Sequence, residues 1–443
     1  MTSRPAVCLD VGSGWVKALG IDSGGQPSGI AQQATTPSDL LEGVHAAASA
    51  VGLAGPLTPR RPAGEDSGAE LLACSSAGGG LRLAVVGLDR LASTEAGYQV
   101  ACSSGARLVH VQAGLLEPSG VRALRAARPD VVLLVDGVGA AAPQSLLRNA
   151  ARLARARVRA PIVLSVHESV RADALALLRA TARNVVTAEP ALPATGRVSP
   201  GSARAAVATL LGGHLVGGRG SATTARFRRL ARYTTPRAVG RGLVELVRVR
   251  DAPGGAVLAV DVGSSTTDVY SALPGDPPEL ARSTSEADLG MRRSAEGILT
   301  DGQAAGLIDP VEADLLTPAV RRLAEETGYL PTDSGGRAED RRLAALAAVL
   351  AVRRHLRVER ERLAEVGVGL VVLTGGVFRQ PDPNELASIR VTLRSDSELR
   401  ELLEDCPVAT DDGFALAPAG LLAERGRLEA AHTVLDAAIA PDN

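Results

Sequence analysis

The sequence predicts an α/β protein made of two related lobes, with a third, parallel α/β domain inserted in the chain. Two apolar strands, far apart in the sequence, each run into the same Asp-Val-Gly-Ser turn, at residues 10–13 and 261–264. Between these copies, short apolar strands alternate with helix-compatible segments, which is the pattern of a parallel sheet covered on both faces. A length of 443 residues allows roughly three domains of about 150 residues each.

The composition is that of an ordinary globular protein and excludes several functional classes. Hydrophobic residues make up 45% of the chain, and the net charge of −1 argues against a broad surface for nucleic acid or anionic lipid. The longest apolar run, residues 343–352, is far shorter than the roughly 20 residues that cross a membrane. Four cysteines without a CxxC pair suit a reducing compartment. We therefore expect a cytoplasmic protein with no nucleic-acid or membrane partner.

The first repeat opens the chain. The apolar run at residues 6–11 enters Asp-Val-Gly-Ser-Gly and then turns back into a second apolar stretch, which predicts a strand, a tight turn that needs glycine, and a returning strand. The second repeat, at residues 256–270, has the same arrangement. Identical placement of the turn at the end of a strand favours internal duplication over chance.

The segment between the repeats predicts the inserted domain. Its apolar runs are at residues 81–86, 107–111, 130–135, 161–166 and 184–187. Gly- and Pro-rich stretches at 52–80 and 193–200 mark its expected hinges, and the glycine-rich stretch 212–220 predicts a further loop. The predicted division is residues 1–80 for the first lobe, 81–200 for the inserted domain, 201–255 for the rest of the first lobe with connecting helices, 256–430 for the second lobe and 431–443 for a C-terminal tail.

The second lobe continues with helical patterns and one more strand. Helices are expected at 289–299, 310–326 and 339–366. A buried strand at 369–374 then runs into Gly375-Gly376, and the region 411–425 predicts a short extended segment followed by a helix.

Three loops of small residues therefore follow apolar strands, and their chemistry suits a polyphosphate. Glycines let the backbone approach phosphate, while hydroxyls and N–H groups donate to its oxygens. Asp10 and Asp261 can hold Mg²⁺ through water. Gly375 and Gly376 can let an adenosine lie against bare backbone. The candidate phosphate-binding residues are Gly12, Ser13, Gly14 and Lys17 in the first loop, and Gly263, Ser264, Ser265, Thr266 and Thr267 in the second.

Lys17 is singled out by composition as well as by position. It is the only lysine in the chain, against 47 arginines. An ammonium is a compact point charge, whereas a guanidinium is a broad planar fork. A tight phosphate loop that admits only the point charge explains why one lysine is kept there.

These motifs resemble those of a known ATPase superfamily. The residues 10–18 resemble phosphate loop 1 of the actin, sugar-kinase and heat-shock-chaperone ATPases, 261–268 resemble phosphate loop 2, and 373–377 resemble the adenosine motif. Within that superfamily the chain is most similar to the glutamate mutase L family, the methylaspartate mutase accessory proteins, through the segments 129–134, 235–239, 262–271 and 286–292. It departs from that family at 135–140, where Val-Asp-Gly-Val-Gly-Ala replaces a glycine-rich turn.

The resemblance implies an actin-like ATPase fold with two ribonuclease-H-like lobes and an inserted parallel α/β domain. It also implies an ATP-dependent accessory or reactivating factor, similar to a chaperone, for an adenosylcobalamin-dependent aminomutase. Such a protein would be a slow Mg²⁺-dependent ATPase that works as a conformational switch, with ATP and Mg²⁺ as cofactors and Asp10, Asp261 and Asp268 as its catalytic residues.

Two other functions remain open on the residues alone. A small-molecule kinase on the same fold needs a carboxylate to take the acceptor's proton, and Asp268 or Asp288 could supply it. An actin-like scaffold would use ATP as an assembly switch, and the near-neutral charge permits a homo-oligomer. The chain has no GxxxxGK[ST] motif, which excludes a P-loop, and no Asp-x-His-x-x-Gly, so it is not expected to be the mutase itself.

Overall fold

The computed structural model forms two compact units. The larger unit comprises Met1–Gly79 with Val216–Asn443, and the inserted unit comprises Gly80–Leu215. The residues that the structure describes are 4–36, 39–52, 69–76, 81–104, 106–136, 142–156, 158–192, 199–215, 227, 230–250, 255–276, 281–292, 294–379, 389–394 and 396–439.

The first sheet of the larger unit has five strands in the order β10-β4-β1-β2-β3. Strand β1 pairs antiparallel with β2 and parallel with β4, and β3 and β10 complete the two edges. The strands are β1 (Ala6–Val11), β2 (Trp15–Ile21), β3 (Pro27–Ala34), β4 (Glu70–Ser75) and β10 (Ala231–Thr234).

The second sheet repeats this arrangement in the order β13-β12-β11-β14-β15. Here too the first strand of the lobe pairs antiparallel with the second and parallel with the fourth. The strands are β11 (Ala256–Val262), β12 (Thr267–Ala272), β13 (Arg282–Glu286), β14 (Val368–Thr374) and β15 (Val408–Thr410). Counted within each lobe, both sheets have the order 3-2-1-4-5, which confirms the predicted actin-like fold with two ribonuclease-H-like lobes.

Helices cover both faces of these sheets. One core lies between the second sheet and several helices, and another lies between the first sheet and α1. A third core joins both sheets to the remaining helices. The helices are α1 (Leu40–Ala50), α8 (Thr235–Val249), α9 (Ala295–Ala304), α10 (Pro310–Glu325), α11 (Ser334–Val366), α13 (Arg400–Leu403), α14 (Leu416–Glu424) and α15 (Leu428–Ala438), with a 3-10 turn η1 (Gly376–Phe378).

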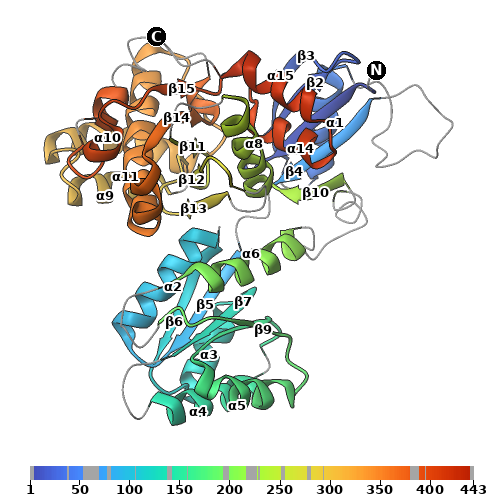
Figure 1. Ribbon diagram of the computed structural model, residues 1–443. Helices are drawn as coiled ribbons and strands as arrows, with labels where there is room; N and C mark the ends of the chain where they lie inside the picture. Colours follow the sequence, from blue (N-terminus) through green and yellow to red (C-terminus); the bar gives the residue numbers. More distant parts are fainter. Residues whose placement is uncertain are drawn as a thin grey trace. The chain divides into compact units, whose positions relative to one another are not determined.

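Two of these helices cross with their backbones in contact. Figure 1 shows α8 and α14 side by side between the two sheets of the larger unit. A Cβ added to Gly242 would lie 1.9 Å from the carbonyl oxygen of Leu416, and one added to Gly420 would lie 1.8 Å from that of Ala238. Only glycine fits at either position, so the crossing of the two helices is set by these two residues.

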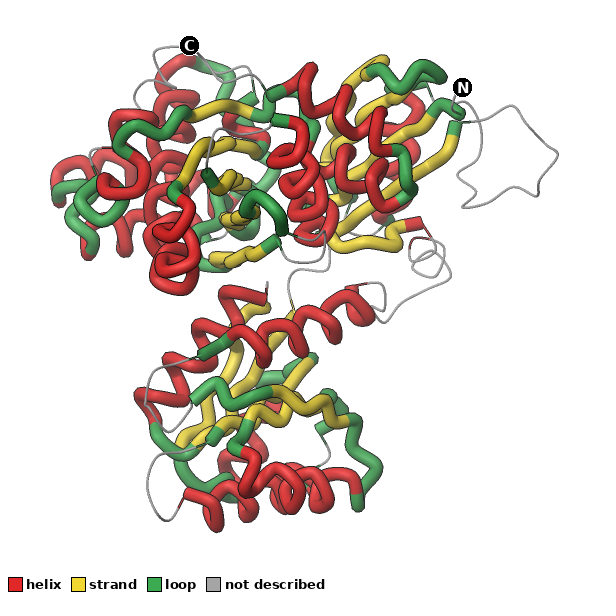
Figure 2. The backbone as a smooth tube through the Cα atoms, in the orientation of Figure 1, coloured by secondary structure: helices red, strands yellow, loops and turns green. Residues whose placement is uncertain are grey.

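The inserted unit is a parallel sheet covered on both faces, as Figure 2 shows. Its strand order is β6-β5-β7-β8-β9. Helices α2 and α6 pack on one face, and α3, α4 and α5 pack on the other. The elements are β5 (Leu81–Gly87), α2 (Arg90–Ser104), β6 (Ala106–Ala113), α3 (Pro118–Ala126), β7 (Val131–Val135), α4 (Ala142–Arg155), β8 (Ile162–Ser165), α5 (Glu168–Arg179), β9 (Val185–Ala188) and α6 (Gly201–Leu215).

Helix α6 extends the inserted unit beyond its expected end at residue 200. Ala203 and Val207 of α6 are fully buried in the same core as Leu83 and Val85 of β5. The helix also continues to Leu215, so the start of the glycine-rich stretch 212–220 is helical rather than a loop.

The structure differs from the sequence prediction at two further places in the larger unit. Residues 289–292 and 294 are not helical, since α9 begins only at Ala295. The expected tail at 431–443 instead begins inside α15, where Val434 and Leu435 are buried in the core between the lobes. Several segments of the prediction lie outside the described residues: 137–140, where the chain departs from the family's glycine-rich turn, most of the hinges at 52–80 and 193–200, and residues 216–220.

Replacing Gly420 with alanine should destabilise the larger unit, because the added methyl group meets a carbonyl oxygen and the two helices must separate. We expect a loss of roughly 1–3 kcal/mol, the usual cost of overpacking, measured by chemical denaturation. Gly328→Ala is the matched control, since no atom lies within 4 Å of its added Cβ. Equal stability of the Gly420 and Gly328 variants would contradict the tight crossing.

Candidate functional site

The first feature of the site is the buried carboxylate of Asp10 at the end of β1. Asp10 is 5% exposed, and its Oδ1 accepts a hydrogen bond of 2.5 Å from the hydroxyl of Thr235, the first residue of α8. The thiol of Cys74, on the neighbouring strand β4, lies 3.5 Å from the same oxygen. Burial raises the pKa of Asp10, while the Lys17 charge and the Thr235 hydrogen bond oppose that rise. A cation near this carboxylate would favour its charged form.

The two Asp-Val-Gly-Ser turns have the same backbone geometry. The N–H of Gly12 donates to the carbonyl of Trp15 at 2.9 Å, and the N–H of Gly263 donates to that of Thr266 at 2.9 Å. Each turn therefore closes an equivalent hairpin, β1–β2 in one lobe and β11–β12 in the other.

The equivalent hairpins carry different charges. Asp10 pairs across its hairpin with Lys17, whereas Asp261 pairs across its hairpin with Asp268. The duplication has thus placed a cation in one lobe and a second carboxylate in the other.

The tips of the two turns meet. The Ser13 hydroxyl lies 3.2 Å from the Ser264 hydroxyl and 2.7 Å from the Ser265 hydroxyl. A Cβ added to Gly14 would lie 2.9 Å from the Ser264 oxygen, so glycine permits this approach. Three hydroxyl groups from the two lobes are therefore gathered at one place, where each can donate to an anion instead of to its neighbour.

Asp268 is the second carboxylate of the second hairpin, and its pKa is strongly raised. Its pKa is about 7, because burial and, less strongly, the Asp261 charge raise it while hydrogen bonds from Ser285 and Thr266 oppose that rise. The Thr266 hydroxyl donates to Asp268 Oδ2 at 2.8 Å. A carboxylate with a pKa near neutrality can both accept and release a proton at physiological pH, which is what a general base needs.

The ammonium of Lys17 lies beside an aromatic ring. Its Nζ lies 5.5 Å from the centroid of the Phe414 ring, and its charge acts on Asp10 and Asp411. Phe414 has a φ of 52°, an uncommon conformation for a bulky residue. The guanidinium of Arg379 lies 5.6 Å from the same ring. The ring therefore lies near two cations at the start of α14.

Arg379 brings an unsatisfied donor to the site. Its Nη1 donates to Gln32 Oε1 of β3 at 2.6 Å, which joins the second lobe to the first. Its buried Nη2 has no hydrogen-bond partner in the described part of the chain. Burial lowers the pKa of Arg379, and the charges of Asp411, Asp261 and Asp10 counteract this. A buried donor without an acceptor is the feature expected where an anionic ligand binds.

The two glycines after β14 differ in how closely other atoms pack around them. Gly375 has a φ of 117°, and a Cβ there would lie 2.4 Å from the carbonyl oxygen of Val262. Gly376 has nothing within 4 Å of an added Cβ. The first glycine is therefore needed to pack β14 against the end of β11, while the second leaves open backbone beside the site.

Four residues of this cluster were missing from the sequence prediction: Thr235, Arg379, Asp411 and Phe414. Asp411 accepts hydrogen bonds from the N–H groups of Ala415 and Leu416 and so begins α14. Arg379 follows the Gly-Gly pair by only a few residues, which is the one local signal that could have found it. The others come from ends of remote elements.

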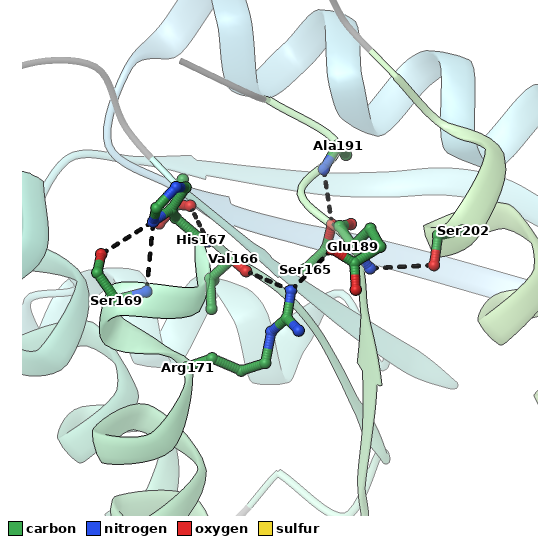
Figure 3. Close-up of polar contacts among 9 residues, drawn as sticks. Ser165, Val166, His167, Ser169, Arg171, Glu189, Ala191 and Ser202 are labelled. Atoms are coloured by element: carbon green, nitrogen blue, oxygen red, sulfur yellow. Dashed lines mark hydrogen bonds and ion pairs between the residues drawn. The ribbon is translucent and has the colours of Figure 1, made fainter.

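The inserted unit has polar residues at the carboxyl edge of its sheet, but they bind one another. Figure 3 shows the Ser165 hydroxyl donating to the carbonyl of Glu189 and accepting from the N–H of Ala191, at 2.7 and 2.9 Å. Arg171 holds Glu189 and the carbonyl of Val166, while His167 caps α5. These contacts fix the loops after β8 and β9, which is a structural role.

Within the described residues, no three His, Cys, Asp or Glu side chains gather as a set of metal ligands. In the same part of the chain, no helix combines the length and the hydropathy that crossing a bilayer requires.

Comparison with solved structures finds sugar kinases over nearly the full length of both chains. Gluconate kinase from Lactobacillus acidophilus is 11% identical with a TM-score of 0.37, covering 99% of this chain and 93% of that one. Xylulose kinase from Bifidobacterium adolescentis is 12% identical with a TM-score of 0.33, covering 100% and 96%. Both TM-scores are below 0.5, so the description of the fold rests on the two sheets themselves.

Comparison with known sequences is more specific about the family than comparison with solved structures. Protein MutL from Clostridium tetanomorphum is 28% identical over 304 residues, which are 65% of this chain and 64% of that protein. The chain therefore matches less than two thirds of this relative's length. The family model described as MutL protein matches residues 6–439, and the chain thus belongs to the MutL (glutamate mutase L) family.

Proposed function

We propose that this protein binds Mg-ATP between the turns at 10–17 and 261–268, and that it acts as an ATP-dependent accessory or reactivating factor for an adenosylcobalamin-dependent aminomutase of the glutamate mutase type. The observation that carries the ATP part is the meeting of two duplicated turns through the hydroxyls of Ser13, Ser264 and Ser265. Membership in the MutL family supports the choice of client.

The residues present fit Mg-ATP. The orphaned Nη2 of Arg379 and the charge of Lys17 suit an anion, and the buried Asp10 carboxylate suits a nearby cation. Asp10 and Asp261 would hold Mg²⁺ through its water shell, and the ion would neutralise charge on the phosphate oxygens. The hydroxyls of Ser13, Ser264 and Ser265 and backbone N–H groups of the two turns would bind those oxygens, with Gly375 and Gly376 beside the adenosine.

Asp268 would supply the base for hydrolysis. Its carboxylate would accept the proton of the attacking water, a role that suits a pKa of about 7. Binding of nucleotide by both lobes would draw them together, and release of the products would let them part. In this proposal that slow cycle is the switch that acts on the mutase.

A small-molecule kinase is the second candidate, and the same observation on Asp268 favours it, since the base could equally take the proton of an acceptor hydroxyl.

To test the proposed function, an adenosylcobalamin-dependent aminomutase that has been inactivated by turnover is incubated with this protein, ATP and Mg²⁺. We expect mutase activity to return only when all three are present. ATP consumption that instead requires a small acceptor molecule would favour the kinase.

Substitution of the two aspartates should affect hydrolysis more than binding, because each acts on phosphate through the metal. In Asp10→Ala and Asp261→Ala we expect the rate at saturating ATP to fall on the order of 100-fold, with a much smaller change in affinity. Calorimetry with Mg-ATP and a phosphate-release assay measure the two effects. Parental hydrolysis in both variants would contradict the assignment of Mg²⁺.

The pKa of Asp268 predicts the pH dependence of hydrolysis. A base works in its deprotonated form, so the rate should rise with pH up to about 7 and level off above it. Asp268→Asn should bind ATP normally, lose roughly 100-fold in rate and lose this pH dependence. A variant that keeps the parental profile would show that another group is the base.

Because Lys17 is the only lysine in the chain, we expect ATP binding to be sensitive even to its replacement by arginine. Lys17 lies near Asp10, Asp411 and the Phe414 ring, where the wider guanidinium of arginine cannot take the same position. Lys17→Arg should weaken ATP binding by roughly 1–3 kcal/mol, and Lys17→Ala by at least as much, with melting temperatures unchanged. Parental affinity of Lys17→Arg would contradict the inference from composition but not the proposed site.

A further inference from the structure

The segment Glu286–Arg292, which we call the backing segment, lies behind the second Asp-Val-Gly-Ser turn. The Thr267 hydroxyl donates to the carbonyl of Leu289 at 2.7 Å. The N–H groups of Met291 and Arg292 donate to the carbonyls of Gly263 and Ser264, each at 3.0 Å. The backing segment therefore takes up two carbonyl groups of the turn.

These hydrogen bonds orient the turn. In a trans peptide, the N–H points opposite to the C=O of the same unit. Since the carbonyls of Gly263 and Ser264 point to the backing segment, the N–H groups of Ser264 and Ser265 point away from it. The second Asp-Val-Gly-Ser turn is thus held with two N–H donors directed away from the backing segment.

Close packing adds to this support. A Cβ added to Gly290 would lie 2.4 Å from the carbonyl carbon of Ser265 and 2.5 Å from its oxygen. The backbone of the backing segment therefore lies directly against the turn, and a side chain at residue 290 would displace it.

One guanidinium ties the start of the backing segment to helix α11. Arg354 Nη1 donates to Glu286 Oε2 at 2.6 Å, and its two terminal nitrogens bind Asp288 at 2.8 and 2.9 Å. Arg354 also binds Asp301 of α9. The Glu286 side chain is only 1% exposed, so its charge depends strongly on the cation. The fork of arginine contacts both carboxylates together, which an ammonium cannot reproduce.

We propose that Arg354 is a positioning residue for polyphosphate binding, which it supports by holding the backing segment against the turn at 261–268. The proposal rests on the proposed function, because it assumes that this turn binds phosphate. Arg354 itself would not touch the nucleotide. Loss of Arg354 leaves the carboxylates of Glu286, Asp288 and Asp301 without the cation that joins them, and the backing segment then moves away from the turn.

The test compares ATP with adenosine, which has no phosphate. In Arg354→Met and in Gly290→Ala, the affinity for Mg-ATP should fall at least about 10-fold, the effect of losing one or two well-aligned hydrogen bonds. Adenosine affinity, measured by ligand-observed NMR, should stay within about twofold, because its site is separate from the turn. Arg354→Lys should recover part of the ATP affinity.

Matched controls separate positioning from general stability. Arg353, the preceding residue on α11, has a side chain that is 9% exposed, against 15% for Arg354, and it binds Asp396 and Glu398 instead of the backing segment. Arg353→Met should lower the melting temperature while the folded protein keeps its ATP affinity, and Gly328→Ala controls for Gly290→Ala.

The outcomes are distinguishable. If the unaltered protein binds no Mg-ATP, the proposed function and this inference both fail. If it binds Mg-ATP and the Arg354 and Gly290 variants bind it equally well, only this inference fails. Equal loss of ATP and adenosine would also overturn it, since that indicates a general disturbance. Should Arg354→Met not fold, Gly290→Ala decides alone.

Discussion

The crossing of α8 and α14 is the constraint on which the rest of the larger unit depends. Gly242 and Gly420 let the two backbones touch, and a single methyl group at either position would force them apart. The first residue of α8 is Thr235, whose hydroxyl binds Asp10 in the first lobe. Helix α14 begins beside Phe414, and Asp411 accepts hydrogen bonds from the N–H groups at its start. Burial raises the pKa of Asp411, and the Lys17 charge is among the effects that oppose this rise. One helix crossing therefore sets the positions of side chains that no single lobe could bring together.

In the proposed function, the two equivalent hairpins supply a cation in one lobe and a base in the other. Their backbones close in the same way, but the residue opposite the strand-ending aspartate is Lys17 in one lobe and Asp268 in the other. In our proposal, the first hairpin offsets the charge of the phosphates and the second activates water. Carbonyl groups of both turns are held by a neighbouring segment: Thr35 donates to those of Gly12 and Gly14, and the backing segment donates to those of Gly263 and Ser264. Only the second of these segments is bound by Arg354 in the described part of the chain.

The sequence was sufficient for the features that depend on local patterns. Both turns, the alternation of strands and helices in the inserted unit, and the Gly375-Gly376 pair follow from apolar runs that end in small residues. The sequence was insufficient where tertiary contacts determine the local structure or bring residues together. Residues 289–299 have helical spacing, yet the N–H groups of Met291 and Arg292 bind the carbonyls of Gly263 and Ser264, and the helix begins only at Ala295. Thr235, Arg379 and Phe414 belong to elements far apart in the chain, and their proximity follows from the helix crossing and the packing of the sheets.

The central claim is that the two turns bind one nucleotide together. Hydrogen exchange of the backbone amides, measured with and without Mg-ATP, tests this most directly because it reports on both turns in the same experiment. We predict slower exchange at residues 10–17 and at 261–268 together, with a smaller effect when Mg²⁺ is removed. Protection of only one turn, or of neither at a saturating concentration of Mg-ATP, would contradict a shared site.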